Sequence, residues 1–305
     1  MPFGAVDPGF GHRLGLIDLW DSMGPLFLYL GIVLVVAYVS FGLVLLFMQS
    51  RFLYRPVRDV SFTPADLDLD FEEITFQSDD GMTLYGWFVP ASKPRATVLF
   101  CHGNGGNIMH RLDTINLLQG MDLSCFVFDY RGYGKSEGKP SESGTYLDAR
   151  AAYDWLTKTR GVPADQVVIF GRSLGGSIAA HLAGRVASRG LVIESTFTSF
   201  PDIGAKFYPY MPVRPFARYR YNTRDHLSRV RCPILVMHSP DDGLVPYEFG
   251  TQLFETANEP KQFVKLIGGH NDGFLVSGDL YKDAWSRWLD SLGDTGAEGA
   301  VHRAS

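Results

Sequence analysis

Short apolar runs alternate with segments of helical periodicity along most of this chain, and this alternation constrains the fold most strongly. The apolar runs lie at 97–101, 124–128, 166–170, 191–193, 233–237 and 262–267, and the helical segments at 108–118, 145–159, 174–187, 247–256 and 280–291. Continuous apolar strands separated by helices are typical of a mostly parallel sheet that is covered on both faces. The sequence therefore predicts an α/β fold.

A β-hairpin is expected before the alternation begins. Segments 71–77 and 82–89 flank the turn sequence Ser78-Asp79-Asp80-Gly81, and Asp-Gly is a strong hairpin signal. With this hairpin the predicted sheet has eight strands, in a domain that covers residues 71–292. A chain of 305 residues with 46% hydrophobic content has enough apolar side chains for one such domain and a short appendage.

Residues 197–231 interrupt the alternation and are rich in aromatic, proline and arginine residues. We expect this insertion to form a small lid over the carboxyl edge of the sheet, where open α/β sheets bind ligands. Its aromatic side chains either pack the lid onto the domain or contact substrate. Its arginines either lie on the domain surface or rest against anionic lipid headgroups.

The N-terminal part of the chain contains a long apolar segment. Residues 22–50 include no charged side chain, and residues 26–48 are almost wholly apolar. At about 1.5 Å per residue, such a helix crosses a hydrocarbon core of about 30 Å. A core helix would have a polar stripe, and a cleaved signal peptide would have a basic leader and a small-residue cleavage site. This segment shows none of these features.

A transmembrane helix is therefore predicted at 25–48, between an N-terminal segment (1–24) and a juxtamembrane linker (49–70). The small, polar tail at 293–305 is expected to be disordered. Arg51, Arg55 and Arg58 follow the apolar segment, whereas Arg13 is the arginine that precedes it. This bias predicts a single-pass protein with its folded domain on the cytoplasmic side.

Composition and cysteine spacing exclude some classes of partner. The net charge of −5 and the pI of about 5.9 do not favour a nucleic-acid partner. Cys101, Cys125 and Cys232 match no metal-ligand spacing. We therefore expect no metal and no cofactor. The predicted transmembrane helix makes a lipid bilayer one expected partner of the chain.

Ser173 is the predicted nucleophile. It is the central residue of Gly171-Arg172-Ser173-Leu174-Gly175, which follows the apolar run 166–170 and precedes a helical segment. This strand–turn–helix context is what a nucleophile turn requires, because the serine must stand exposed above the sheet edge while small residues let strand and helix approach each other.

A serine hydroxyl needs a base, and the base needs an acid that orients it. His270 is the predicted base, because it lies in a glycine-rich loop after the last apolar run, whereas His102 and His238 are expected to have structural roles or roles in the oxyanion loop. For the acid, Asp241 and Asp242 both follow the run 233–237, and Glu194 ends the run before it. The residues alone leave these three open.

Two backbone N–H groups are expected to hold the oxyanion of the tetrahedral intermediate. Leu174, directly after the nucleophile, supplies the first. The second is expected from the glycine-rich loop 102–107, at Asn104, where the glycines allow close approach to a substrate carbonyl.

Together these motifs resemble α/β hydrolases of the Bem46 type. The resemblance runs from about residue 52 to 289 and rests on the loop 102–107, on 129–138, on the serine turn, on 194–197, on 238–246 and on 268–272. It implies an N-terminal membrane anchor, and some members have the hydrolase domain on the non-cytoplasmic side. It also implies that the acid lies four residues after His238, at Asp242, although Ser239 departs from the family's glycine at that position.

The resulting hypothesis is a membrane-anchored serine hydrolase that cleaves carboxylic esters or thioesters through Ser173, His270 and Asp242. The expected substrate is an acyl ester or thioester, such as a lipid or an acylated protein near the bilayer. Two alternatives are a serine peptidase of the same fold and a catalytically silent membrane scaffold. The resemblance does not identify the substrate, and no substrate-binding residue is predicted.

Overall fold

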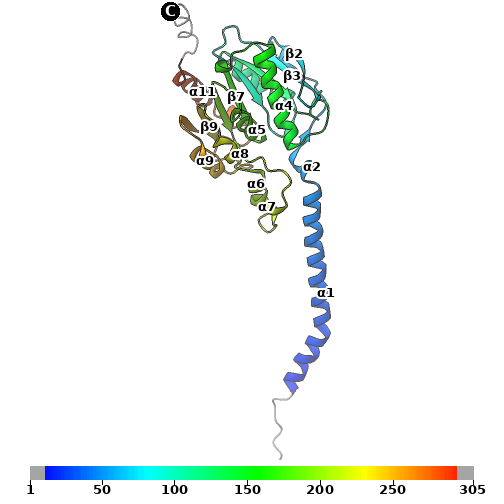
Figure 1. Ribbon diagram of the computed structural model, residues 1–305. Coiled ribbons are helices and arrows are strands. Elements are labelled where there is room, and N and C mark those ends of the chain that lie inside the picture. Colours follow the sequence, from blue (N-terminus) through cyan, green and yellow to red (C-terminus); the bar gives the residue numbers. More distant parts are fainter. Residues whose placement is uncertain (1–10, 294–305) are drawn as a thin grey trace, which may run out of the picture. The chain divides into compact units, whose positions relative to one another are not determined.

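The computed structural model describes residues 11–293 in two compact units that meet between Gln49 and Ser50. The first unit contains the helix α1 (Gly11–Phe47) (Figure 1). Its segment Met23–Phe47 is long and apolar enough to cross a membrane, and its central apolar side chains are exposed. The predicted span, 25–48, lies at nearly the same place. The expected tail lies almost entirely outside the described residues.

The second unit is built around one eight-stranded sheet, as the sequence predicted. Its strands are β2 (Glu72–Gln77), β3 (Thr83–Val89), β4 (Ala96–Cys101), β6 (Leu123–Asp129), β7 (Val167–Arg172), β8 (Gly190–Glu194), β9 (Ile234–His238) and β10 (Lys261–Lys265). Their spatial order is β2-β3-β6-β4-β7-β8-β9-β10. The hairpin strand β3 runs antiparallel to β2 and β6, and every other neighbouring pair is parallel.

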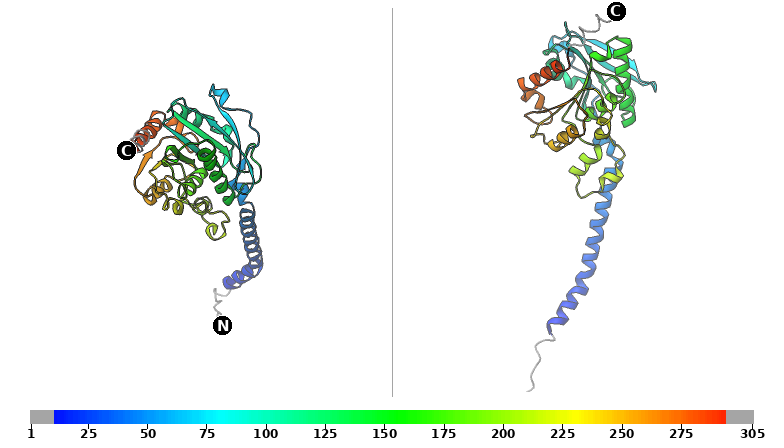
Figure 2. Two further views of the ribbon diagram at one scale, coloured as in Figure 1. Left: turned by 45° about the horizontal axis from the view of Figure 1, so that its top comes forward. Right: turned by 60° about the vertical axis from the view of Figure 1, so that its left-hand side comes forward.

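Helices cover both faces of this sheet (Figure 2). The longer ones are α3 (Leu112–Gln119), α4 (Glu142–Asp154), α5 (Leu174–Ala183), α9 (Tyr247–Thr256) and α11 (Asp279–Ser291). Successive side chains of a strand point to opposite faces, so Leu99 belongs to the core beneath α4, α5 and α9, while its neighbour Phe100 belongs to the core beneath α3 and α11. The predicted helix 145–159 continues beyond α4 as one π-helical turn, Trp155–Thr159.

Residues 50–58, which we call the strap, pack onto the folded domain although the sequence predicted a linker there. After α2 (Gln49–Leu53), the two-residue strand β1 (Arg55–Pro56) pairs in parallel with β5 (Gly105–Gly106). Leu53 and Tyr54 are buried, and the Tyr54 hydroxyl lies 2.7 Å from that of Tyr221. Burial of two apolar side chains and a backbone ladder hold the strap in place.

The insertion between β8 and β9 forms three short helices, α6 (Phe200–Phe207), α7 (Val213–Phe216) and α8 (Thr223–Leu227). Phe197 and Tyr221 are buried in the domain, whereas Phe207 and Phe216 are exposed. The aromatic residues of the predicted lid therefore divide between packing and exposed positions. The remaining elements are η1 (Pro64–Leu67), η2 (Ile108–Arg111), η4 (Ala164–Gln166) and α10 (Gly273–Val276).

Candidate active site

Ser173 occupies a strained turn between β7 and α5. Its backbone has φ 55° and ψ −121°, a conformation that costs a non-glycine residue of order 1–3 kcal/mol. Gly171 and Gly175 make the turn possible, since a Cβ atom at Gly171 would overlap the backbone of Gly175, and one at Gly175 would overlap that of Cys101. The Ser173 N–H also donates to the Glu194 carbonyl at 2.9 Å. The neighbouring strand thus fixes the turn that presents the hydroxyl.

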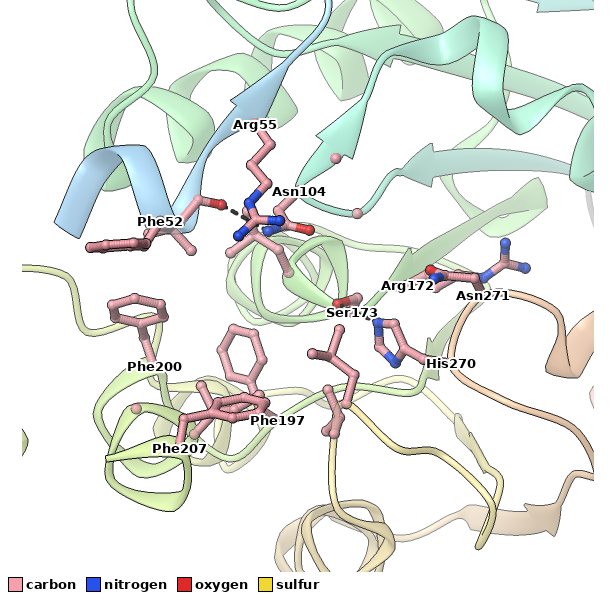
Figure 3. A pocket seen from close by; sticks show the side chains of 18 of the residues that line it. Phe52, Arg55, Asn104, Arg172, Ser173, Phe197, Phe200, Phe207, His270 and Asn271 are labelled. Atoms are coloured by element: carbon pink, nitrogen blue, oxygen red, sulfur yellow. Dashed lines mark hydrogen bonds between the residues drawn. The ribbon is translucent and has the colours of Figure 1, made fainter. Parts of the chain in front are cut away.

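A chain of hydrogen bonds joins the three predicted residues. The Oγ of Ser173 lies 3.1 Å from Nε2 of His270 (Figure 3). Nδ1 of His270 lies 2.8 Å from Oδ2 of Asp242. The side chains come from the turn before α5, from the loop before α10 and from the loop after β9. Because the two ring nitrogens face different partners, a proton held on Nδ1 leaves Nε2 free to accept one from the serine.

The Asp242 carboxylate is held in place by several donors. Its Oδ1 accepts hydrogen bonds from the N–H groups of Leu244 and Val245, at 2.9 and 2.8 Å. Burial alone would raise the pKa of Asp242, but hydrogen bonds from His238, His270 and the backbone hold that pKa well below its usual range. Asp242 therefore stays ionised at neutral pH.

The other two candidates for the acid lie apart from His270. Asp241 is exposed to solvent. Glu194 is buried and pairs with Arg172, whose Nε lies 2.7 Å from Oε1, and it also accepts a hydrogen bond from the Tyr281 hydroxyl at 2.8 Å. Of the three carboxylates that the sequence left open, only Asp242 contacts the histidine.

His102 and His238 both lie in structural positions, which is one of the two roles that the sequence left open for them. His102 is fully buried between the rings of Tyr130 and Tyr133, and its Nε2 lies 3.6 Å from Asp129. Nε2 of His238 lies 2.9 Å from the Val245 carbonyl and 3.5 Å from Asp242. His238 thus supports the loop that carries the acid.

The strap braces the loop that contains Asn104. The Asn104 side-chain amide donates to the Leu53 carbonyl at 2.9 Å. The backbone carbonyl of Asn104 accepts hydrogen bonds from the Arg55 N–H at 3.2 Å and from the Tyr133 hydroxyl at 2.8 Å. Among the described residues, the backbone N–H groups of Asn104 and Leu174 have no backbone acceptor. Both N–H groups belong to residues that border the cavity described next.

A cavity of about 540 Å³ opens over Ser173, within the usual size range of small-molecule sites. Figure 3 shows Phe52, Phe197, Phe200 and Phe207 gathered on one side of it, with Ser173 and His270 on the other. The cavity is also lined by polar residues from several elements, namely Arg55, Asn104, Arg111, Arg172 and Asn271.

Sequence reasoning missed most of these lining residues. Phe52 and Arg55 fall in the segment that was expected to be a linker, and Arg111 lies in the first turn of the predicted helix 108–118, which carried no motif. The apolar triplet Phe52-Leu53-Tyr54 was the available signal, because three consecutive large apolar side chains are unusual in an exposed linker.

Known proteins resemble this chain in sequence and in fold. A family model for the α/β-hydrolase fold matches residues 96–221. The uncharacterized protein Rv2307c of Mycobacterium tuberculosis is 35% identical, over 85% of this chain and 94% of its own length. Protein bem46 of Schizosaccharomyces pombe is 30% identical, over 71% of this chain and 76% of its own length.

The fold also matches that of a solved enzyme. The esterase Pf2001 of Pyrococcus furiosus superposes with a TM-score of 0.65 at 21% identity, covering 78% of this chain and 97% of the esterase. At that identity the likeness concerns the fold, whereas the relatives of 30% identity or more establish common descent. The chain therefore belongs to the α/β-hydrolase family and, within it, to the group of Bem46-type proteins.

Proposed function

We propose that this chain is a membrane-anchored serine hydrolase that cleaves carboxylic ester or thioester bonds through an acyl-enzyme. The observation that carries the proposal is the hydrogen-bonded series Ser173, His270 and Asp242 at the base of a largely apolar cavity. The esterase whose fold matches that of this chain supports the same class of reaction.

In the first half of the proposed reaction, the Ser173 Oγ attacks the carbonyl carbon of the substrate while Nε2 of His270 takes the hydroxyl proton. The carbonyl oxygen becomes an oxyanion that accepts hydrogen bonds from the N–H groups of Leu174 and Asn104. The carbon–oxygen or carbon–sulfur bond then breaks, and Nε2 returns the proton to the leaving alcohol or thiol. Asp242 stabilises the transient imidazolium and keeps the remaining ring proton on Nδ1.

In the second half, water replaces the leaving group. His270 takes one proton from the water molecule while the water oxygen attacks the acyl carbon. The same two N–H groups hold the second oxyanion. Collapse of this intermediate releases a carboxylic acid and returns the proton to Ser173. A group that stabilises both oxyanions without moving lowers both barriers, which is why the bracing of the Asn104 loop matters for turnover.

The preferred substrate class is an amphiphilic acyl ester or thioester. Four phenylalanine side chains provide an apolar wall for an acyl chain, and the apolar helix of the first unit favours residence at a bilayer. Such a position would bring lipids or acylated proteins within reach. Because Arg51, Arg55 and Arg58 follow the apolar segment, the proposed side for the folded domain is cytoplasmic, which protease protection in sealed vesicles tests.

Fluorophosphonate labelling tests the proposal, because this reagent attaches covalently to an activated serine. The full-length protein should be labelled in detergent, and Ser173→Ala should abolish labelling. Ser177→Ala is the matched control, since Ser177 lies one helical turn further along α5 and is buried. This control variant should be labelled like the unmodified protein.

Three results would contradict the proposal. Equal labelling of the unmodified protein and Ser173→Ala would mean that another residue reacts. Absence of labelling in both, with the native circular-dichroism spectrum retained, would favour the silent scaffold. Cleavage of peptide amides faster than of esters with the same acyl group would favour the peptidase alternative.

A further inference from the structure

The cavity over Ser173 has a largely apolar lining that also includes positively charged side chains. Three arginines, Arg55, Arg111 and Arg172, contribute to its lining, and no aspartate or glutamate does so among the described residues. The lining also includes His270, which faces Asp242 and Ser173, and Tyr208. A cavity that only held a neutral acyl chain would gain nothing from three cations at its wall.

Arg172 is accounted for by its surroundings. Its guanidinium pairs with Glu194, donates to the Thr114 hydroxyl at 3.0 Å and lies 3.9 Å from the centre of the Phe274 ring. Arg172 and Glu194 are both buried, so the pair is nearly neutral as seen from the cavity. The remaining positive charge comes from Arg55 and Arg111.

Arg55 and Arg111 form no ion pair within the described part of the chain. The side chain of Arg55 is exposed, and Figure 3 shows its guanidinium beside Asn104 at the cavity. Arg111 donates to the Gly105 carbonyl, but its Nε is buried without a hydrogen-bond partner. A buried guanidinium nitrogen without an acceptor is costly, so its persistence needs a reason.

Burial and the neighbouring charge of Arg172 lower the pKa of Arg111 to about 10. Arg111 is therefore still a cation at neutral pH. The buried carboxylate of Asp129 acts on Arg111 through space and forms no ion pair with it. Its charge is thus compensated less completely than that of Arg172.

Both arginines contact Gly105 in the loop 102–107, Arg55 through its backbone and Arg111 through its guanidinium. Arg55 is the strand partner of Gly105, and Arg111 donates to the carbonyl of the same glycine. Gly103, two residues earlier, lies against Ser173, since a Cβ atom on it would come within 3.6 Å of the Ser173 Cβ. Two residues of extended chain span at most about 7 Å, so the backbone segment that both arginines contact lies near Ser173, and both arginines line the same cavity as Ser173.

We propose that Arg55 and Arg111 form an anion subsite, and that the substrate is an acyl ester or thioester carrying a phosphate or carboxylate a few bonds from the scissile carbonyl. This inference rests on the proposed hydrolase function and narrows its substrate class. The apolar wall takes the acyl chain, and the two guanidinium groups donate charge-assisted hydrogen bonds to the anion. A neutral ester of the same shape leaves both cations without a partner.

Two matched pairs of esters test the subsite on the full-length protein in detergent. The first pair, 1-hexanoylglycerol and its 3-phosphate, places the anion on the leaving group. The second pair, the 4-nitrophenyl ester of hexanoic acid and the mono-4-nitrophenyl ester of adipic acid, places it on the acyl chain. The quantity compared is the ratio of kcat/KM for the charged and neutral member of a pair, which does not depend on the fraction of active protein.

The unmodified protein should favour the charged member of at least one pair by about 10-fold or more, which corresponds to one or two charge-assisted hydrogen bonds. Arg55→Gln and Arg111→Gln should each lower that ratio about 10-fold. Arg111→Lys should retain most of the preference, because it keeps the charge. A purely structural role of Arg111 at Gly105 would change both members of a pair equally and leave the ratio unaltered.

Arg150→Gln is the control for removal of a positive charge elsewhere, since Arg150 pairs with Asp154 on α4 and does not line the cavity. Its ratio should equal that of the unmodified protein. A ratio near 1 in both pairs, with hydrolysis that depends on Ser173, would overturn the anion subsite alone. Loss of Ser173 dependence would instead overturn the proposed function.

Discussion

Asp241 and Asp242 are adjacent in the chain but have opposite environments. Asp242 is buried, contacts His270 and accepts two backbone hydrogen bonds, whereas the side chain of Asp241 is exposed. The difference arises from the turn after β9, in which the N–H groups of Leu244 and Val245 point back at one carboxylate. Two neighbouring residues of the same type thereby have different environments, and the proposed mechanism gives them different roles.

Substitution of each aspartate by asparagine separates these roles. Asp242→Asn should lower kcat for 4-nitrophenyl hexanoate by about 10³–10⁴-fold, because an amide stabilises the wrong tautomer of His270 and does not stabilise the imidazolium. Asp241→Asn should change kcat less than about 3-fold. Steady-state kinetics on the two purified variants measures both effects, and the reverse order would mean that Asp241 is the acid.

At this scale, the pairing of Ser173 with His270 could be predicted from the sequence, while the choice of Asp242 as their partner needed a family resemblance or a structure. Ser173 carries a local signature, because its strained turn requires small neighbours close in sequence. The choice among Asp241, Asp242 and Glu194 depends on which carboxylate lies near a histidine far along the chain. The positions of Arg55 and Arg111 around Gly105 have the same origin, since tertiary packing brings them together.

Among the elements, the strap shows most clearly how a short segment acts on the site. Its strand β1 has two residues, too few for any periodic pattern, which is why the sequence predicted a linker. The strap nevertheless supplies a ladder partner for β5, through β1, and a carbonyl acceptor for the Asn104 side chain, at Leu53. The loop that is proposed to offer the second oxyanion donor is thereby tied to the segment that follows the apolar helix in sequence.

Asn104→Ala tests this bracing. The variant keeps the backbone N–H but loses the hydrogen bond to the Leu53 carbonyl, so the donor should be held less firmly. We expect kcat for 4-nitrophenyl hexanoate to fall about 10-fold while KM changes little, since the lost interaction acts in the transition state. A kcat equal to that of the unmodified protein would show that the strap does not position the loop.

Asn258→Ala is the matched control for this prediction. The Asn258 amide also donates to backbone carbonyls, those of Ser228 and Val230, but it does not line the cavity. Its substitution should leave kcat and KM unchanged. A fall in kcat like that of Asn104→Ala would indicate a general loss of stability as the cause.

For the whole molecule, the alternation of apolar runs and helical segments, together with the hairpin signal before it, was sufficient to predict the eight-stranded sheet. Each central strand is buried on both faces and therefore reads as a continuous apolar run. The three short helices of the insertion were not predicted individually, because prolines and clustered aromatic residues obscure their periodicity. Their identity depends on contacts with the sheet domain rather than on local pattern.

The apolar helix determines where the molecule should reside. Its 25 residues from Met23 to Phe47 extend about 37 Å, enough for a hydrocarbon core of about 30 Å with some tilt. The full-length protein should therefore stay in the membrane fraction after a carbonate wash. Release of the unmodified protein by salt or carbonate would contradict anchoring by this helix.

Two arginines in the middle of the helix should prevent its insertion. A charged residue at the centre of a membrane helix costs about 2.5–3.5 kcal/mol, so the double variant Val33→Arg, Val36→Arg should appear in the soluble or aggregated fraction. The double variant Val33→Leu, Val36→Leu is the control and should fractionate like the unmodified protein.

The central claim is that Ser173 carries the acyl group during turnover. The most direct measurement is acid quenching of the full-length protein within milliseconds of mixing with 4-nitrophenyl acetate, followed by mass spectrometry of its peptides. The account predicts an acetyl group on Ser173, formed at the rate of the 4-nitrophenol burst and absent from Ser173→Ala. An acetyl group on another residue at that rate, or turnover that passes through no covalent intermediate, would contradict it.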